Sequence, residues 1–286
     1  MADMSIADQL VFTTMRIECY DSAGNLSSGS GFRFDFCEEE DRNIPALVTN
    51  KHVIEGATSG VVHLHTADED GHPIAGEHVR VPINNFRDAW VLHPDPHTDL
   101  AVMPLAGLYE WAFGAYQKKI FYKSVGHAFL ATSDDLAELS AGEDIFMIGY
   151  PNGLWDSKNN LPIVRRGITA TPPKFDFEGR KEFVIDCACF PGSSGSPVFL
   201  FNSGAYTHKD GSIIVGGRLK LLGVLYAGPQ HTAQGEIHVR PVPTKNEPIA
   251  LSRIPNNLGY CIKAEQLLAF DEHFREILAT ASGDES

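Results

Sequence analysis

Short apolar runs separated by turn-forming residues cover most of this chain of 286 residues. In the clearest run, Phe32, Phe34 and Phe36 alternate with charged residues, which places the aromatic rings on one face of a strand and the charges on the other. Similar runs recur at residues 11–19, 60–64, 99–103, 145–149, 182–189, 197–201 and 221–227. Because strands do not alternate regularly with helices, the pattern predicts an all-β fold.

Two segments depart from this pattern. From about residue 264 onward, apolar residues recur every three or four positions, at Leu267, Phe270, Phe274 and Ile277, which predicts an amphipathic C-terminal helix. Residues 105–137 fit a linker better than regular strands. We expect the aromatic side chains of this linker to be buried: Trp111, Phe113, Tyr116, Phe121 and Tyr122.

One loop carries a candidate nucleophile. Residues 190–197 read Phe-Pro-Gly-Ser-Ser-Gly-Ser-Pro, which places Ser194 between two glycines. Gly192 and Gly195 permit backbone angles that a side chain would obstruct, so the amides of Gly192 and Ser194 can point at one developing oxyanion. Out of context, the same residues also fit an ordinary flexible surface turn.

A serine hydroxyl is a poor nucleophile at neutral pH, and it needs a histidine as base and an acid that orients the histidine. Both groups lie upstream of the loop. His52 follows an apolar run, and Asp99 lies in a turn that leads into another apolar run. Either residue alone has an ordinary explanation, as a strand-end histidine or a turn aspartate. Together with Ser194, they predict a catalytic triad.

These segments, in this order, resemble the trypsin-like serine peptidases with the chymotrypsin fold, and among them the bacterial branch that includes the HtrA-type proteases. The motifs that carry the resemblance lie at residues 49–53, 99–102 and 192–197. Weaker matches at residues 28–32, 142–153, 222–228 and 257–262 extend it over about residues 9–263. HtrA-type proteases usually append a PDZ domain, and we expect none within this chain.

The resemblance implies two six-stranded antiparallel Greek-key β-barrels and a C-terminal α-helix. From its apolar stripe, we expect this helix to pack on the second barrel. We expect one peptidase domain in four parts: a barrel with His52 and Asp99 at 1–112, an inter-barrel linker at 113–138, a barrel with Ser194 at 139–263, and the helix and tail at 264–286.

The resemblance also implies the activity, which is that of a serine endopeptidase acting through an acyl-enzyme on Ser194. His52 would be the general base and acid, Asp99 would orient it, and the backbone at Gly192, Ser193 and Ser194 would form the oxyanion hole. No metal or organic cofactor is required. Two alternatives stay open: a partner-activated regulatory protease or esterase with one dedicated substrate, and a non-catalytic peptidase fold that binds protein.

The specificity pocket is predicted less sharply. Ala188 occupies the position where tryptic relatives carry an aspartate, so we expect an uncharged pocket that accepts a small or medium apolar side chain. Tyr226, Ala227 and Gly228 would be in its walls. If Asp186 reached the pocket instead, basic side chains would be preferred. In digestive relatives, an aspartate just before the nucleophile pairs with a new N-terminus, and Ser193 makes that route of activation doubtful here.

Charge and cysteine content limit the partners and the compartment. The formal net charge of −14 argues against a nucleic-acid ligand. We therefore expect protein or peptide substrates, with an activating or inhibiting protein as a further candidate partner. Charged residues interrupt the first 30 positions, so we expect no signal peptide and no membrane span. The five cysteines lie mostly in expected strands, which favours reduced thiols in the cytoplasm.

Two local patterns resemble metal sites only superficially. Cys187 and Cys189 are separated by one residue, whereas zinc-binding pairs usually have two to four residues between them. His93 and His97 flank two prolines, and the segment is better explained as a rigid turn that leads to Asp99. We therefore expect no metal.

Overall fold

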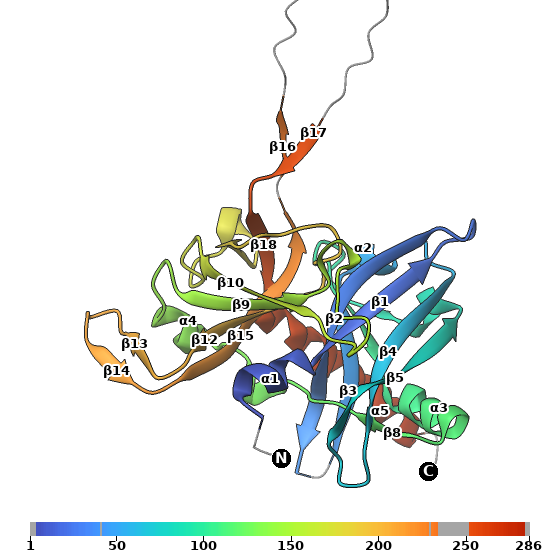
Figure 1. Ribbon diagram of the computed structural model, residues 1–286. Helices are drawn as coiled ribbons and strands as arrows, with labels where there is room; N and C mark the ends of the chain where they lie inside the picture. Colours follow the sequence, from blue (N-terminus) through green and yellow to red (C-terminus); the bar gives the residue numbers. More distant parts are fainter. Residues whose placement is uncertain (1–3, 41, 229, 234–251, 284–286) are drawn as a thin grey trace, which may run out of the picture.

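The computed structural model describes residues 4–40, 42–228, 230–233 and 252–283 (Figure 1). Two groups of antiparallel strands lie side by side, the first formed by the N-terminal part of the chain and the second by the C-terminal part (Figure 1). The all-β fold with a C-terminal helix is therefore confirmed. The four domain boundaries stay a prediction, and the last residues of the expected tail, 284–286, lie outside the described residues.

The first half is an eight-stranded sheet in the order β5-β4-β1-β2-β3-β7-β6, with β8 paired to β4. Its strands are β1 (Thr14–Tyr20), β2 (Leu26–Glu39), β3 (Arg42–Thr49), β4 (Ser59–Ala67), β5 (Pro73–Asn84), β6 (Val91–Leu92), β7 (Ala101–Pro104) and β8 (Lys119–Phe121). It differs from the expected six-stranded closed barrel, because the short β6 and β8 are added and the pairings among described residues form an open path.

The second half is a closed barrel of six strands in the order β10-β11-β18-β15-β12-β9, as expected. Its strands are β9 (Asp144–Gly149), β10 (Ile163–Thr169), β11 (Glu182–Asp186), β12 (Pro197–Asn202), β15 (Arg218–Ala227) and β18 (Leu258–Lys263). Two hairpins project away from this barrel (Figure 1). They pair β13 (Ala205–Thr207) with β14 (Ile213–Val215), and β16 (Gln230–Ala233) with β17 (Ser252–Pro255).

Helices connect and cover the strands. The α-helices are α1 (Ile6–Val11), α2 (Lys51–Ile54), α3 (Ala106–Tyr116), α4 (Ser133–Ala137) and α5 (Leu268–Gly283). The short 3-10 helices are η1 (Phe86–Ala89), η2 (His127–Phe129), η3 (Pro151–Gly153), η4 (Phe177–Gly179) and η5 (Ala264–Leu267). Within the described part of the chain, no helix is long and apolar enough to cross a membrane.

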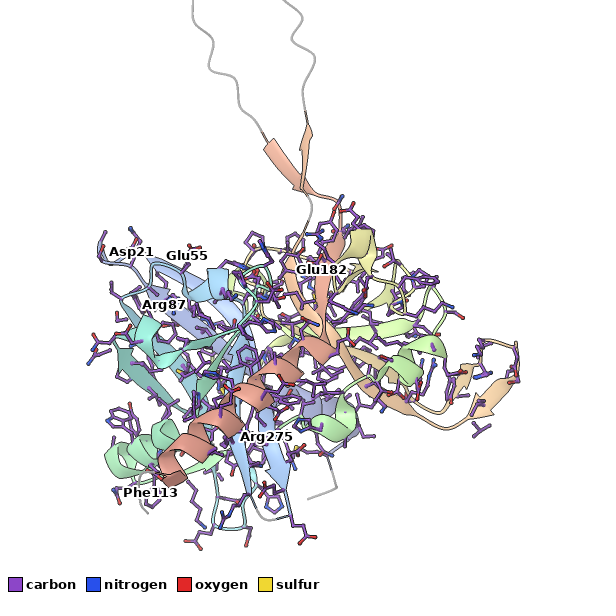
Figure 2. All side chains as sticks on the ribbon, turned by 180° about the vertical axis from the view of Figure 1, so that it is seen from behind. Asp21, Glu55, Arg87, Phe113, Glu182 and Arg275 are labelled. Atoms are coloured by element: carbon purple, nitrogen blue, oxygen red, sulfur yellow. The ribbon has the colours of Figure 1, made fainter. Side chains whose placement is uncertain are left out.

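The expectation that the C-terminal helix packs on the second barrel is wrong in its main contact. Figure 2 shows α5 crossing the back of the molecule. Phe270 and Phe274 place their rings 6.0 and 5.6 Å from that of Phe36, between centroids, and Phe36 belongs to β2 of the first half. The apolar stripe of α5 is removed from water by packing against the buried aromatic face of β2. One core cluster therefore contains residues of both halves. The stripe ends before Ile277, which is exposed.

The linker aromatics are mostly exposed, which contradicts the sequence-based expectation. Trp111, Phe113, Tyr116 and Tyr122 are exposed, and only Phe121 is buried. The reason is that α3 buries Ala112 and turns Trp111, Phe113 and Tyr116 outward, and Figure 2 shows Phe113 at the edge of the molecule. All five cysteines are free and buried, as expected for packed thiols.

Two histidines on β4 are buried, and one of them, His63, packs against Trp155 in the loop after η3. His63 and His65 are each more than nine-tenths buried, and the ring of His63 is 5.0 Å from that of Trp155. Among the described residues, Nε2 of His65 has no hydrogen-bond partner. Burial lowers the pKa of His65 to about 4, and burial is the main cause that lowers the pKa of His63, against the opposing charge of Glu18. Both rings are therefore neutral near pH 7.

We expect the protein to lose stability as the pH falls from about 6.5 toward 4. Below the ordinary histidine pKa the unfolded chain takes up a proton at His65, whereas the folded chain does not until about pH 4. Full loss of this contribution amounts to about 3 kcal/mol. Urea unfolding across this range should show a smaller loss in His65→Gln than in the native protein. The exposed control His72→Gln should behave like the native protein, and equal pH dependence in all three would contradict the assignment.

Candidate active site

Local structure brings His52 and Asp99 together. His52 lies on the one-turn helix α2, directly after β3, and Asp99 lies in the turn between β6 and β7. His52 Nδ1 is 2.5 Å from Asp99 Oδ2, and the backbone N–H of His52 donates to Asp99 Oδ1 at 3.1 Å. The Asn50 side chain donates to the Asp99 carbonyl at 2.7 Å and holds this turn. The carboxylate therefore favours the proton on Nδ1 and leaves Nε2 available as a base.

Ser194 lies in the loop between β11 and β12, and this loop also contacts strand β2. The backbone N–H of Ser30, on β2, donates to the Ser194 carbonyl at 2.9 Å. At the preceding position, a Cβ on Gly29 would lie 2.4 Å from the side chain of Val53, the neighbour of His52. Two successive residues of β2 thus contact the segments that carry Ser194 and His52. The site lies where the two halves meet.

The structure does not join Ser194 to His52 by a hydrogen bond. Ser194 Oγ donates to the Tyr226 carbonyl at 3.3 Å, and Nε2 of His52 has no hydrogen-bond partner among the described residues. Catalytic hydrogen bonds in unliganded enzymes are often absent or long and form only in the substrate complex.

The peptides beside Ser194 are held so that two amides are free. The Asn152 N–H donates to the Pro191 carbonyl at 2.5 Å, and the Ser196 N–H donates to the Ser193 carbonyl at 3.0 Å. Because C=O and N–H point in opposite directions in a trans peptide, the N–H groups that follow these carbonyls point away from the bonds. They belong to Gly192 and Ser194. Within the described residues neither has a hydrogen-bond acceptor, so both are available to an oxyanion.

Ser193 does not add a third donor to this arrangement. Its N–H donates to the Phe190 carbonyl at 3.0 Å and closes a turn, which is a correction to the sequence-based set. The turn depends on glycine, because Gly192 has a φ of +86° and a Cβ there would lie 2.6 Å from the Tyr150 carbonyl oxygen.

A pocket of about 260 Å³ adjoins Ser194, with walls formed by Cys189, Phe190, Pro191, Ser194, Leu225, Ala227 and Gly228. Ala227 and Gly228 are where the sequence placed them. Ala188 and Tyr226 are not in the walls, and Tyr226 instead donates its hydroxyl to Glu182 at 3.0 Å. Asp186 is exposed and also lies outside the walls. No charged side chain belongs to the described lining.

Sequence reasoning missed four residues of the pocket, Cys189, Phe190, Pro191 and Leu225. The sequence feature related to Cys189 is the absence of a side chain at Gly259, because a Cβ there would lie 2.6 Å from the Cys189 sulfur. Cys189 lies after the end of β11, and its contact with Gly259 on β18 cannot be read from either segment alone. In the described ranges, one group of side chains has metal-like spacing, Asp68, Asp70 and His72, and none of these residues belongs to this site.

Comparison with known proteins places the chain in a family. A profile described as the trypsin-like peptidase domain matches residues 29–205, more than half of the chain, and this range contains His52, Asp99 and Ser194. Among curated proteins, no significant match was found.

Solved structures of proteases are also similar to this chain, at low identity. The active form of the Rv3671c protease from M. tuberculosis has 14% identity and a TM-score of 0.44, with 91% of this chain and 79% of that chain covered. The serine endoprotease from Yersinia pestis has 16% identity and a TM-score of 0.44, with coverage of 92% and 64%, respectively. Deg5 has 19% identity and a TM-score of 0.43, with coverage of 77% and 81%. On the strength of the domain match, this chain belongs to the trypsin-like peptidase family and is a serine protease.

Proposed function

We propose that this chain is an endopeptidase that forms an acyl-enzyme on Ser194. Ser194 Oγ attacks the substrate carbonyl carbon while His52 Nε2 takes the hydroxyl proton, and Asp99 stabilises the resulting imidazolium. The tetrahedral intermediate then expels the amine, which receives the proton from His52. Water attacks the ester in the same way and regenerates Ser194.

The observation that carries this proposal is the pair of free amides at Gly192 and Ser194. Donors fixed before the substrate arrives do not have to reorganise when negative charge develops on the carbonyl oxygen, and one such donor is commonly worth about a factor of 10² to 10³ in kcat. The His52–Asp99 pair supports the same assignment from the other half of the molecule.

The pocket beside Ser194 favours an uncharged substrate side chain before the scissile bond. A lysine or arginine there would leave its charge without a partner among the described lining residues, and an unpaired buried charge is costly. Its volume of about 260 Å³ suits small and medium apolar groups.

Cleavage of a peptide library by the full chain tests both parts of this proposal. We expect cleavage after Ala, Val, Leu or Met to exceed cleavage after Lys, Arg, Asp or Glu by at least about 10-fold in kcat/KM. The variant Ser194→Ala should show none of it. Preference for basic residues would disprove the pocket assignment, and cleavage that persists in Ser194→Ala would disprove the mechanism.

A partner-activated protease with one dedicated substrate is the second candidate. The observation that favours it is the hydrogen bond from Ser194 to the Tyr226 carbonyl, which occupies the hydroxyl in the unliganded chain. A partner that turned Ser194 toward His52 would then switch the enzyme on. Cleavage of the library only after addition of a cell extract would favour this candidate over a constitutively active enzyme.

A further inference from the structure

A buried serine on β2 contacts the nucleophile loop from the other half of the molecule. The Ser30 hydroxyl donates to the Gly192 carbonyl at 2.8 Å and accepts the Tyr150 N–H at 2.9 Å. The Ser30 N–H donates to the Ser194 carbonyl at 2.9 Å, and the Thr49 hydroxyl donates to the Ser30 carbonyl at 2.7 Å. Ser30 is completely buried. It therefore links β3, the end of β9 and the loop of Ser194.

The surroundings of this hydroxyl are shaped to hold it. Gly149 packs against it so closely that a Cβ on Gly149 would lie 2.7 Å from Ser30 Oγ and 1.9 Å from Ser196 Oγ. A hydroxyl that accepts one hydrogen bond and donates another is also polarised by both, which strengthens each bond in a dry environment. The contact is a defined hydrogen bond between the two halves of the molecule.

Gly192 is the residue that this contact restrains. A glycine has more backbone freedom than any other residue, and Gly192 carries one of the two free amides. Its own carbonyl is held by Ser30, and the carbonyl before it is held by the Asn152 N–H. The peptides on both sides of Gly192 are thus fixed, which determines the direction of its N–H.

We propose that Ser30 is a positioning residue for the oxyanion hole. This inference rests on the proposed function and adds the group that keeps the hole open. Its hydroxyl holds the Gly192 carbonyl, so that the Gly192 N–H stays directed toward the developing oxyanion. The side chain of Ser193 does not restrain the loop in this way, because its hydroxyl is buried and has no hydrogen-bond partner among the described residues.

The test compares Ser30→Ala with Ser27→Ala, the same change at an exposed position of the same strand. The substrate is a peptide with an apolar residue before the scissile bond. We expect Ser30→Ala to lower kcat about 10- to 100-fold, which is less than full loss of a donor, because the Gly192 N–H is misdirected rather than removed. KM should change less than twofold, because the oxyanion forms only in the transition state. Affinity for a peptide boronate, which forms a tetrahedral adduct, should fall by the same factor. Ser27→Ala should match the native enzyme.

Two results would overturn the inference. One is native kcat in folded Ser30→Ala, and the other is a loss that appears in KM and leaves boronate affinity unchanged. If Ser30→Ala does not fold, Ser30→Cys keeps a side chain of similar shape with a weak donor, and the same selective loss of kcat is expected.

Hydrogen exchange separates failure of this inference from failure of the proposed function. If the native protein hydrolyses no peptide, the proposed function fails, and Ser30 is then judged by exchange of the amides in residues 190–196. Faster exchange in Ser30→Ala than in Ser27→Ala would support the restraint, because the loop has lost a hydrogen bond. Equal exchange in the two variants would overturn it.

Discussion

Replacing Asp99 by asparagine is expected to lower kcat by about 10⁴-fold while the fold is retained. The side-chain oxygen of an asparagine can still accept the hydrogen bond from the backbone N–H of His52. Its NH2 group, however, would donate to Nδ1 of the imidazole ring. The histidine would then carry its proton on Nε2 and could not act as a base. Steady-state kinetics on the best library peptide measure this loss.

Asp95→Asn is the matched control for this change. Asp95 lies in the same turn and is exposed. Among the described residues, its carboxylate accepts hydrogen bonds only from the backbone of His97 and the hydroxyl of Thr98. We expect its kcat to stay within about threefold of native, since a surface substitution of this kind alters stability by about 0.5 kcal/mol or less. Equal losses in Asp99→Asn and Asp95→Asn would show that the turn, and not the orientation of His52, is responsible.

Replacing Gly195 by alanine should destabilise the protein by more than about 3 kcal/mol and abolish activity. Gly195 has a φ of +86°, and a Cβ there would lie 1.9 Å from the Ser30 carbonyl oxygen and 2.5 Å from the Thr49 hydroxyl. These atoms belong to the contact between the halves, so they cannot move without disturbing β2. Urea unfolding measures the loss of stability.

Gly211→Ala separates the two causes of this effect. Gly211 also has a φ of +86°, but a Cβ there would meet no atom within 4 Å. Only the backbone strain remains, and we expect a loss of about 1 kcal/mol with native activity. A comparable loss in both variants would mean that the close approach of β2 to the Ser194 loop contributes nothing.

Local patterns in the sequence were sufficient to predict most strands, and together with the family resemblance they led to the assignment of His52, Asp99 and Ser194, which stays a prediction. The alternation around Phe34 marks β2, and the apolar run before His52 marks β3, because one side of each strand is buried whatever its partners are. The glycines beside Ser194 predicted a turn with positive φ, because glycine tolerates this conformation better than any other residue.

What the sequence could not predict depends on contacts between distant segments. The burial of Ser30 and its bond to Gly192 require the two halves to meet, and no local pattern encodes that meeting. The packing of α5 on Phe36 could not be predicted for the same reason, because the apolar stripe of the helix would fit against either half. The exposed rings of α3 show that hydrophobic residues in a linker need not be buried in a core.

The cytoplasmic location stays a prediction.

Labelling with a fluorophosphonate probe tests the central claim most directly, because the probe reacts with an activated serine whatever the natural substrate is. We predict stoichiometric labelling of the native chain at Ser194, identified by mass spectrometry of the modified peptide, and none in Ser194→Ala or His52→Ala. Folded native protein that stays unlabelled, or labelling that persists in Ser194→Ala, would contradict the assignment of Ser194 as the nucleophile.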